Sequence, residues 1–371
     1  MRVLHFYKTS LPETMGGVEQ VIHHLAENSP RFGIRSDVLS LTKNKSHEIR
    51  YANYKVFQMH KDFEIASTGF SWQAIFKLKK ILQSYDVIHY HYPWPFMDMV
   101  HFLLHIKTPS VVTYHSDIVK QRGLLHLYKP LQDWFLKRVD KIVPTSIAYV
   151  HSSETLKHYK NKLHVIPLGV NAKDFTRPSS KILRRWKSKL STPFFLFVGV
   201  LRYYKGLKYL IEAAKSTKAL IVIAGNGPLL QELLLQVKRE ELQNVIFVGA
   251  ISDEDKSALL QLCLGFVFPS HKRSEAFGIA LLEAAMVGKP LISCEIGTGT
   301  SFINQDKVTG FVVPPEDPRA LSEAMNKLLQ NPNLRQKMGS KAKARYRSIF
   351  TVDRMVNGYV KLYRSLAKGN L

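Results

Sequence analysis

The sequence alternates short apolar runs with longer amphipathic stretches, and this rhythm occurs twice along the chain. In the first half, the runs that we expect to form strands are residues 2–7, 35–41, 86–91, 110–114, 141–145 and 163–166. In the second half they are residues 194–199, 219–224, 244–248, 264–268, 290–293 and 310–313. Strands that alternate with helical stretches are typical of βα units around a parallel sheet. The rhythm therefore predicts an α/β protein with two parallel sheets.

The length of the chain also favours two domains. Its 371 residues exceed the roughly 100–200 residues that are usual for one domain. Between the two sets of strands, the segment 167–171 (PLGVN) is followed by a polar, basic stretch to Ser191, which is typical of a hinge or linker near 170–190. We therefore predict one domain over residues 1–175 and a second over residues 176–351. A terminal helix over about 352–371 can pack back on the first domain.

The chain is strongly basic, with 53 Lys and Arg against 29 Asp and Glu and a net charge of +24. Such a charge indicates a polyanionic neighbour, which is a nucleic acid, an anionic membrane or a phosphorylated ligand. Nucleic-acid-binding proteins usually carry a dense basic block or a basic surface with interleaved aromatic residues. Here the charge is scattered over both halves, so we expect no nucleic-acid partner.

The sequence also bears on the compartment of the protein. Its two cysteines, Cys263 and Cys294, are too few for a disulfide framework. No apolar run approaches the roughly 18 residues that span a bilayer, and residues 1–8 are too short and polar for a signal peptide. We expect a cytoplasmic protein.

Two amphipathic stretches, residues 70–85 and 122–141, combine aromatic or leucine side chains with lysines. Such stretches can lie on an anionic bilayer, which would make the protein peripheral on the inner face of the cell membrane. The alternative is a core-facing helix with a solvated basic side.

Glycine pairs follow two of the predicted strands. Gly16 and Gly17 come after the first strand, and Gly225 and Gly227 come directly after the strand at 219–224. Glycines between a strand and a helix let backbone N–H groups approach a phosphate, although a plain tight turn is the alternative. The G-x-G-x-x-G pattern of a dinucleotide fold is absent, which disfavours a dinucleotide-dependent oxidoreductase.

Two cations, Arg202 and Lys205, follow the predicted strand at 194–199. Open α/β sheets bind ligands at the carboxyl ends of their strands, and two cations there can clamp two phosphates. A solvated loop with two cations is the alternative.

Two carboxylates, Glu275 and Glu283, are separated by an apolar segment that carries no other charge. Buried carboxylates need partners, and a polyhydroxylated ligand supplies them because a carboxylate accepts two hydroxyl donors. Gly278 would let backbone N–H groups at the helix start meet a phosphate. The alternative is a first-turn acid at 275 and a salt-bridged helix residue at 283.

Histidines stand at the ends of two predicted strands. His89 and His91 end one strand, and His115 follows another with Asp117 close behind. We expect His115 and Asp117 to be functional, and we expect His89 and His91 to line a cleft. No metal-binding spacing such as H-E-x-x-H occurs, so we expect neither a metal nor a cofactor.

Taken in order, these motifs resemble those of glycosyltransferase family 4, whose GT-B architecture consists of two Rossmann-like domains that face a central cleft. The most specific part is the element from Glu275 to Glu283. It is supported by Gly16-Gly17, His115 and the segments 167–170 and 225–228. The resemblance implies a retaining glycosyltransferase that uses a nucleotide-sugar donor.

The resemblance also implies roles for individual side chains. Glu283 would hold the ribose hydroxyls of the donor, and Glu275 would hold the transferred sugar. Arg202 and Lys205 would neutralise the leaving diphosphate. His115 would border the sugar and the acceptor.

Backbone groups would contact the donor as well, by the same resemblance. Gly17 would approach the diphosphate, and the backbone at Phe277, Gly278 and Ile279 would close on it. Many members carry Arg directly after the glycine that corresponds to Gly199, where this sequence has Val200. The nearby Arg202 is then the residue that takes this role.

The segment 295–301 (EIGTGTS) looks like that of bacterial mannosyltransferases that use GDP-mannose to build lipid-linked glycans. The implied enzyme is an α-mannosyltransferase of lipopolysaccharide or other cell-surface polysaccharide synthesis. Its acceptor would be a glycan or a polyprenyl-diphosphate-linked glycan. The alternatives are a GT-B nucleotide-sugar epimerase and a basic nucleic-acid-binding protein.

Overall fold

The computed structural model describes residues 1–118 and 122–368, and these divide into two compact units. Unit 1 consists of residues 1–169 with the chain from Val352 onward, and unit 2 of residues 170–351. The division thus falls at Gly169 and Val170, shortly before the predicted boundary at 175. Helix α14 (Val352–Lys368) belongs to unit 1. Among the described residues, none of the helices combines the length and apolarity needed to cross a bilayer.

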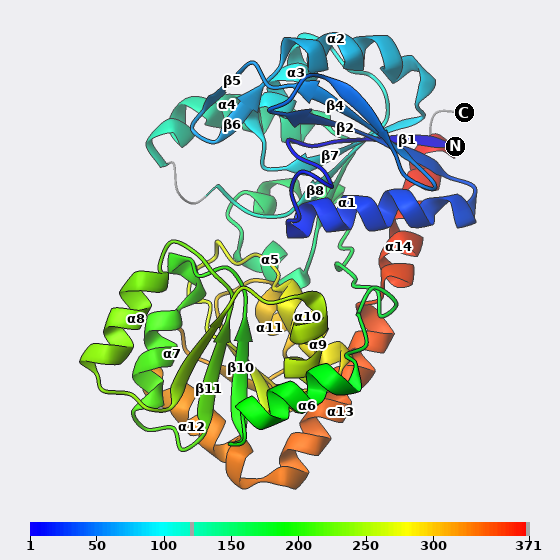
Figure 1. Ribbon diagram of the computed structural model, residues 1–371. Helices are drawn as coiled ribbons and strands as arrows, with labels where there is room; N and C mark the ends of the chain where they lie inside the picture. Colours follow the sequence, from blue (N-terminus) through cyan, green and yellow to red (C-terminus); the bar gives the residue numbers. More distant parts are fainter. Residues whose placement is uncertain (119–121, 369–371) are drawn as a thin grey trace. The chain divides into compact units, whose positions relative to one another are not determined.

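Unit 1 is built on a seven-stranded sheet with the order β3-β4-β2-β1-β7-β8-β9 (Figure 1). Neighbouring strands are parallel except β3 and β4. The strands of this sheet are β1 (Arg2–Phe6), β2 (Arg35–Thr42), β3 (His47–Arg50), β4 (Lys55–His60), β7 (Val87–Tyr92), β8 (Ser110–Tyr114) and β9 (Lys141–Pro144). A separate antiparallel hairpin is formed by β5 (Phe63–Ile65) and β6 (Thr68–Phe70).

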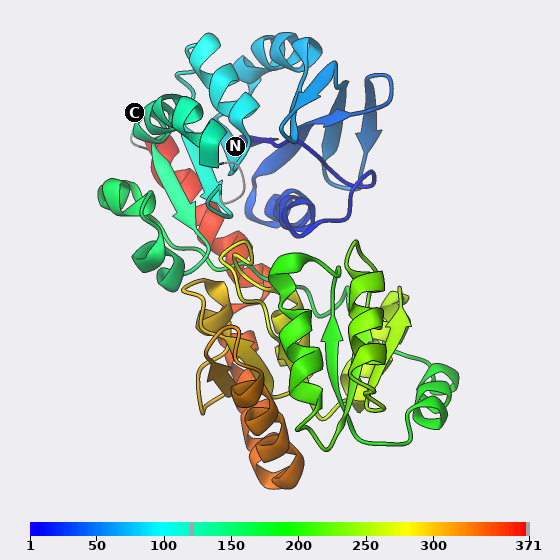
Figure 2. The same ribbon diagram turned by 90° about the vertical axis from the view of Figure 1, so that its left-hand side faces the viewer.

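Helices cover both faces of this sheet. Helices α1 and α14 pack together on one face and α2 lies on the other (Figures 1 and 2). Parallel sheets are buried on both faces, and every residue of β7 and β8 is accordingly buried. Besides α14, the helices of unit 1 are α1 (Gly17–Asn28), α2 (Trp72–Ile81), α3 (Pro95–Leu103), α4 (Arg122–Arg138) and α5 (Ile147–Ser152).

Unit 2 contains a fully parallel six-stranded sheet with the order β12-β11-β10-β13-β14-β15. The chain runs outward from β10 to β12 and then returns to β13 on the other side of β10. Open α/β sheets bind ligands at such a reversal of strand order, outside the carboxyl ends of the strands. The strands are β10 (Phe194–Val198), β11 (Leu220–Ala224), β12 (Val245–Gly249), β13 (Gly265–Phe268), β14 (Leu291–Cys294) and β15 (Gly310–Val313).

Some helices of unit 2, namely α6, α9 and α12, begin at a side-chain cap. Asp317 caps α12 by accepting a bond from the backbone N–H of Ala320, with Pro318 at the first helical position. Ser179 caps α6 in the same way. The helices are α6 (Ser180–Lys189), α7 (Leu207–Ala214), α8 (Leu230–Arg239), α9 (Asp253–Leu262), α10 (Ile279–Met286), α11 (Gly299–Ile303), α12 (Pro318–Gln330) and α13 (Pro332–Ile349).

The predicted strands are all present except residues 163–166. There Leu163 forms a single bridge with Ile142, and the pairing with β9 is limited to the hydrogen bonds that the N–H groups of His164 and Ile166 donate to Ile142 and Pro144. The structure adds β3, β5 and β6, which have only three or four residues each, and β4, whose sequence mixes apolar with polar residues. Helix α6 occupies part of the predicted linker, and its Trp186 indole donates a hydrogen bond to Asp255 of α9 at 2.8 Å.

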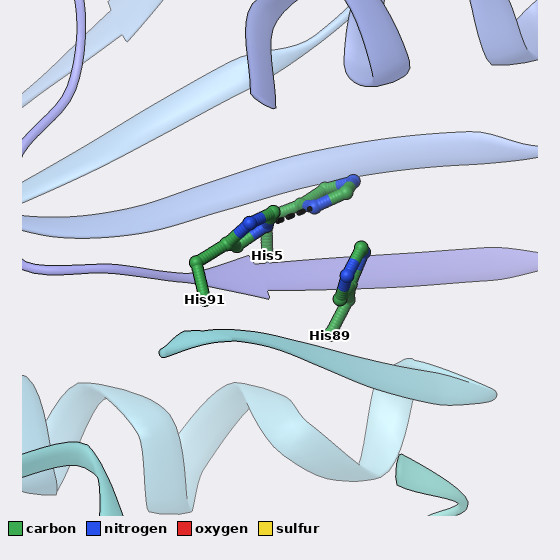
Figure 3. Close-up of side chains that lie close together, drawn as sticks. All are labelled: His5, His89 and His91. Carbon is green, nitrogen blue, oxygen red and sulfur yellow. Dashed lines mark hydrogen bonds between the residues drawn. The ribbon is translucent and has the colours of Figure 1, made fainter. Parts of the chain in front are cut away.

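The pleat of the sheet gathers histidines on one face of unit 1. His5 on β1 lies in register with His89 on β7, and His91 with Thr113 on β8. Residues two apart in a strand share a face, so His89 and His91 point the same way, toward His5 (Figure 3). His5, His89 and His91 are fully buried, and His115 directly after β8 is 7% exposed.

Burial keeps these imidazoles neutral. It lowers the pKa of His5 and of His115 to about 3. It also holds the pKa of His89 and of His91 well below the ordinary value, with the neighbouring histidines adding to the effect. Between about pH 6.5 and pH 3, a histidine of the unfolded protein, with an ordinary pKa near 6.5, binds a proton, whereas the buried histidine of the folded protein stays neutral.

The stability of unit 1 should therefore be complete above about pH 6.5 and should fall as the pH drops toward 3. Each such histidine contributes about 1.4 kcal/mol of lost stability per pH unit in this window. Denaturant unfolding at several pH values measures the slope. The His5→Asn variant removes one titrating group, so its slope should be lower by the same amount. An unchanged slope would show that His5 is not neutral in the folded protein.

Candidate functional site

Three loops meet at the carboxyl edge of the sheet in unit 2, after β10, β11 and β13. Gly225, after β11, has a φ of +136°, and a Cβ there would lie 2.0 Å from the carbonyl oxygen of Gly199. A Cβ on Gly227 would lie 2.6 Å from the backbone of Leu201. Only glycine permits this approach, so the predicted glycines hold the 225–227 loop against the loop after β10.

The loop after β10 ends in a tight turn. Residues Tyr203–Lys205 form one turn of 3₁₀ helix, and Gly206 follows with a φ of +69°. A Cβ on Gly206 would lie 2.0 Å from the carbonyl oxygen of Pro269, just after β13. The turn thereby fixes Lys205 beside the neighbouring strand.

Lys205 and Glu275 form an ion pair at this edge. The Nζ atom of Lys205 donates to Oε2 of Glu275, and both side chains are only 12% exposed. The hydroxyl of Ser270 donates to the same oxygen at 3.3 Å, and Nζ lies 4.6 Å from the ring centroid of Phe268. Two predicted residues that are 70 positions apart are thus brought together with restricted freedom.

Arg202 is exposed at the start of the same turn. Among residues 1–118 and 122–368, no carboxylate pairs with its guanidinium. Guanidinium groups bind phosphates through paired N–H donors. Arg202 is therefore free of a carboxylate partner in the described residues, and its contact with an anionic ligand stays a prediction.

Glu283 is held by a residue that the sequence analysis missed. Its Oε1 accepts a hydrogen bond from Nζ of Lys256 at 2.8 Å, between α10 and α9. Burial disfavours the charge on Lys256, but the attraction and hydrogen bond of Glu283 outweigh it and raise the pKa of the lysine. No local pattern marks Lys256, because the pairing depends on how α9 packs.

Helix α10 begins at Ile279, and Phe277 and Gly278 precede it. Gly278 caps the helix with a φ of +94°, and Phe277 is buried. A Cβ on Gly299 would lie 2.4 Å from the ring of Phe277, so the helix start packs closely on α11. The first backbone N–H groups of α10 lack partners within the helix, as at any helix start.

In unit 1, Gly17 opens α1 and Gly16 occupies the position before it. Glu19 in the first turn accepts hydrogen bonds from the hydroxyls of Thr9 and Thr14 at 2.7 and 2.9 Å. These bonds tie the preceding loop to the helix start. Glu19 was not singled out from the sequence, although an acid in the first turn is a recognisable signal.

His115 pairs with His91 rather than with Asp117. Its Nε2 lies 3.1 Å from Nδ1 of His91. Oδ1 of Asp117 accepts hydrogen bonds from the hydroxyls of Tyr114 and Ser153, both at 2.8 Å. The adjacent strand end, and not the next acid in sequence, therefore orients His115.

His89 and His91 do not line a surface, contrary to the expectation from sequence. Both are fully buried. The ring nitrogens of His89 bond with the hydroxyls of Tyr363 and Thr113 at 2.7 Å. His5 completes the cluster and was missed, although it stands on the strand that pairs with β7.

The edge of unit 2 thus presents two cations and the carboxylate of Glu275 in loops around one reversal of strand order, and the helix that starts there, α10, carries the carboxylate of Glu283. Each carboxylate uses one oxygen for a lysine, and its second oxygen has no partner among the residues that the structure describes. Such an arrangement can accept hydroxyl groups and neutralise a diphosphate at the same time.

Comparisons with known proteins identify the family of the chain. Residues 15–174 match the family described as Glycosyltransferase Family 4, and residues 178–345 match Glycosyl transferases group 1. O-antigen chain mannosyltransferase C of Escherichia coli is 50% identical over 367 residues, which cover 99% of each chain. D-rhamnosyltransferase WbpZ of Pseudomonas aeruginosa is 50% identical over 352 residues, covering 95% of this chain and 92% of that one.

Solved structures share the architecture. Sucrose-phosphate synthase of Thermosynechococcus elongatus matches with a TM-score of 0.82 at 20% identity and covers 99% of each chain. WaaG, a glycosyltransferase involved in lipopolysaccharide biosynthesis, matches with a TM-score of 0.69 at 17% identity, covering 97% of this chain and 99% of that one. The predicted GT-B class, with two parallel-sheet Rossmann-like units, is thereby confirmed. Because it is 50% identical to two curated glycosyltransferases over nearly its whole length, the chain belongs to glycosyltransferase family 4 and is a glycosyltransferase.

Proposed function

We propose that the protein transfers mannose from GDP-mannose to a lipid-linked glycan during O-antigen synthesis, with retention of the anomeric configuration. The Lys205–Glu275 pair carries the proposal, because it sets a cation and a hydroxyl acceptor side by side at the reversal of strand order. The E. coli relative named as a mannosyltransferase supports the choice of sugar. D-rhamnose is the second candidate, because the P. aeruginosa relative is equally similar.

The paired carboxylates suit a sugar nucleotide. Oε2 of Glu275 is engaged by Lys205, which leaves Oε1 for a hydroxyl of the transferred sugar. Oε1 of Glu283 is engaged by Lys256, which leaves Oε2 for the ribose hydroxyls. Each lysine fixes its carboxylate before the ligand binds, which lowers the cost of ordering on binding.

Retention is proposed through attack of the acceptor hydroxyl on the face from which the diphosphate leaves. The new glycosidic C–O bond forms as the C–O bond to the phosphate breaks, and the hydroxyl proton passes to the leaving diphosphate. Arg202 and Lys205 stabilise the charge that develops on the diphosphate. Glu275, held by Lys205 and Ser270, is a poor nucleophile in this arrangement.

The first experiment is transfer by the purified protein to a polyprenyl-diphosphate-linked glycan. GDP-mannose, GDP-D-rhamnose and UDP-glucose are supplied separately, and the linkage of the product is determined by NMR. We expect an α-mannoside from GDP-mannose. A product formed only from a UDP-sugar would contradict the proposed donor. Incubation without acceptor is the control, and a changed sugar that remains on the nucleotide would indicate an epimerase instead.

The Glu275→Gln variant should lose about 100-fold or more of its kcat/KM, because it keeps the shape of the side chain but removes the charge that orders Lys205 and binds the sugar. Glu323→Gln is the matched control, since it breaks the exposed pair with Arg319 on α12, and exposed pairs contribute less than about 1 kcal/mol. Near-normal turnover by Glu275→Gln, or an equal loss in both variants, would remove Glu275 from the site.

An anionic membrane is the proposed location of the acceptor. On α2, Trp72 is 59% and Phe76 70% exposed, and Lys79 and Lys80 are exposed on the same helix. Ile65, on the hairpin that precedes α2, is 59% exposed. Aromatic side chains beside lysines suit the headgroup region of a bilayer that carries negative charge.

The second predicted stretch, 122–141, forms helix α4 and the start of β9. Leu127 on α4 is 83% exposed. Two leucines of this stretch, Leu124 and Leu125, lie outside the described side chains. Helix α2 is therefore the better place for a test.

Flotation with vesicles tests this location. The wild-type protein should float with anionic vesicles and should remain in the bottom fraction with neutral vesicles. Replacing both Trp72 and Phe76 with Ala should weaken the binding at least tenfold, because burying each side chain contributes about 1.5–3 kcal/mol. Leu235→Ala is the control, since Leu235 is 66% exposed on α8 of unit 2. Unchanged flotation of the double variant would exclude α2 as the docking surface.

A further inference from the structure

Three imidazoles of unit 1 form a hydrogen-bonded chain from the buried sheet to the end of β8. Nδ1 of His5 lies 3.1 Å from Nε2 of His91, and Nδ1 of His91 lies 3.1 Å from Nε2 of His115. Figure 3 shows the bond between His5 and His91, with His89 standing apart from it. The nitrogens of His89 bond with hydroxyl groups instead. The chain thus consists of His5, His91 and His115.

A metal ion is a less suitable explanation for these imidazoles. The ligand atoms of His5, His89 and His91 lie within 4.8 Å of one another. A metal needs ring lone pairs that converge on one point. Here the rings of His89 and His91 are tilted by 31° with their centroids 4.3 Å apart, and both nitrogens of each of these two rings are engaged in hydrogen bonds.

The proton positions along the chain are coupled. A neutral imidazole has one donor and one acceptor nitrogen. Burial lowers the pKa values of His5, His91 and His115 far enough to keep all three rings neutral near pH 7. His91 bonds on both sides, so it must accept on one side and donate on the other. The two hydrogen bonds therefore run in the same direction, either from His5 to His115 or from His115 to His5.

The buried end of this row of imidazoles, at His5, decides the direction of its hydrogen bonds. Nε2 of His5 is inaccessible and has no hydrogen-bond partner in the described part of the chain. A proton on this atom would be an unpaired, buried N–H group, which is rarer in proteins than an under-satisfied acceptor. The other end, at Nδ1 of His115, belongs to a side chain that is still 7% exposed. The terminal proton is therefore better placed on His115.

We propose that His5 and His91 are positioning residues that hold His115 as the Nδ1–H tautomer, so that His115 presents a hydrogen-bond donor at the end of β8. The proton of His5 Nδ1 is donated to His91, and that of His91 Nδ1 to His115. The acceptor of the last proton is an oxygen of the sugar nucleotide or of the acceptor glycan, and this identification rests on the proposed function. A protonated Nδ1 cannot take up another proton, so His115 donates a hydrogen bond and does not act as a general base.

The tautomer can be measured directly on the full chain with ¹⁵N-labelled histidine. Long-range ¹H–¹⁵N correlation distinguishes the two tautomers, and a His115→Asn sample identifies the signal of His115 among the 15 histidines. We expect a single Nδ1–H form at pH 7.5. The Nε2–H form would overturn the proposal, and so would a mixture of the two forms.

The role of His91 is tested by ring replacement. His91→Phe keeps a ring but removes the acceptor and donor, so His115 should leave the pure Nδ1–H form. His101→Phe is the matched control, because His101 is also buried but bonds with Tyr90 and not with His5, His91 or His115. It should leave the signal of His115 unchanged. An unchanged tautomer in a folded His91→Phe variant would contradict the proposal, and the wild-type measurement stands if that variant fails to fold.

Transfer activity distinguishes whether His115 donates a hydrogen bond or acts as a general base. Asn and Asp have the same shape, but only Asn carries an N–H donor. We expect His115→Asn to stay within about tenfold of the wild type and His115→Asp to lose about 100-fold or more. The reverse order would identify His115 as a base. Because the NMR signal needs no substrate, an Nδ1–H form in a protein that transfers no sugar would refute the proposed function while leaving the tautomer assignment intact.

Discussion

The reversal of strand order between β10 and β13 is the constraint on which the site depends. Parallel strands bring their carboxyl ends to one edge, and a reversal separates the loops that would otherwise crowd there. Gly206, Gly225 and Gly227 let these loops touch through their backbones. That close contact, together with the turn at Gly206, places Lys205 beside Glu275, so the ion pair depends on the topology of the sheet and on the loop glycines.

In unit 1, the main constraint is that polar side chains are buried on one face of the sheet. A parallel sheet is covered on both faces, so the polar face that holds His5, His89 and His91 must satisfy its hydrogen bonds internally. Helix α14 helps by contributing the hydroxyl of Tyr363 to His89. The terminal segment of the chain thereby completes the core of the first unit, and the end of β8 can carry a polar side chain on a rigid support.

Much of the fold could be predicted because apolar runs of four to six residues are strong signals in buried parallel strands. Strands β3, β5 and β6 were not predicted because they have only three or four residues, and β4 was not predicted because it mixes apolar with polar residues. Residues 163–166 were predicted as a strand but form only one bridge with β9. In the site, Glu275 and Glu283 stood out as carboxylates in apolar surroundings. Lys256 and His5 did not, because their roles arise from helix packing and strand register, which no local pattern records.

Hydrogen–deuterium exchange of the full chain, with and without saturating GDP, tests most directly whether the edge of unit 2 binds the donor. Bound phosphates and hydroxyls should protect the backbone of the loops that they order. The geometry predicts slower exchange in peptides that cover residues 199–206 and 275–283. Binding of GDP without slower exchange in either segment would contradict the assignment of the donor to this edge.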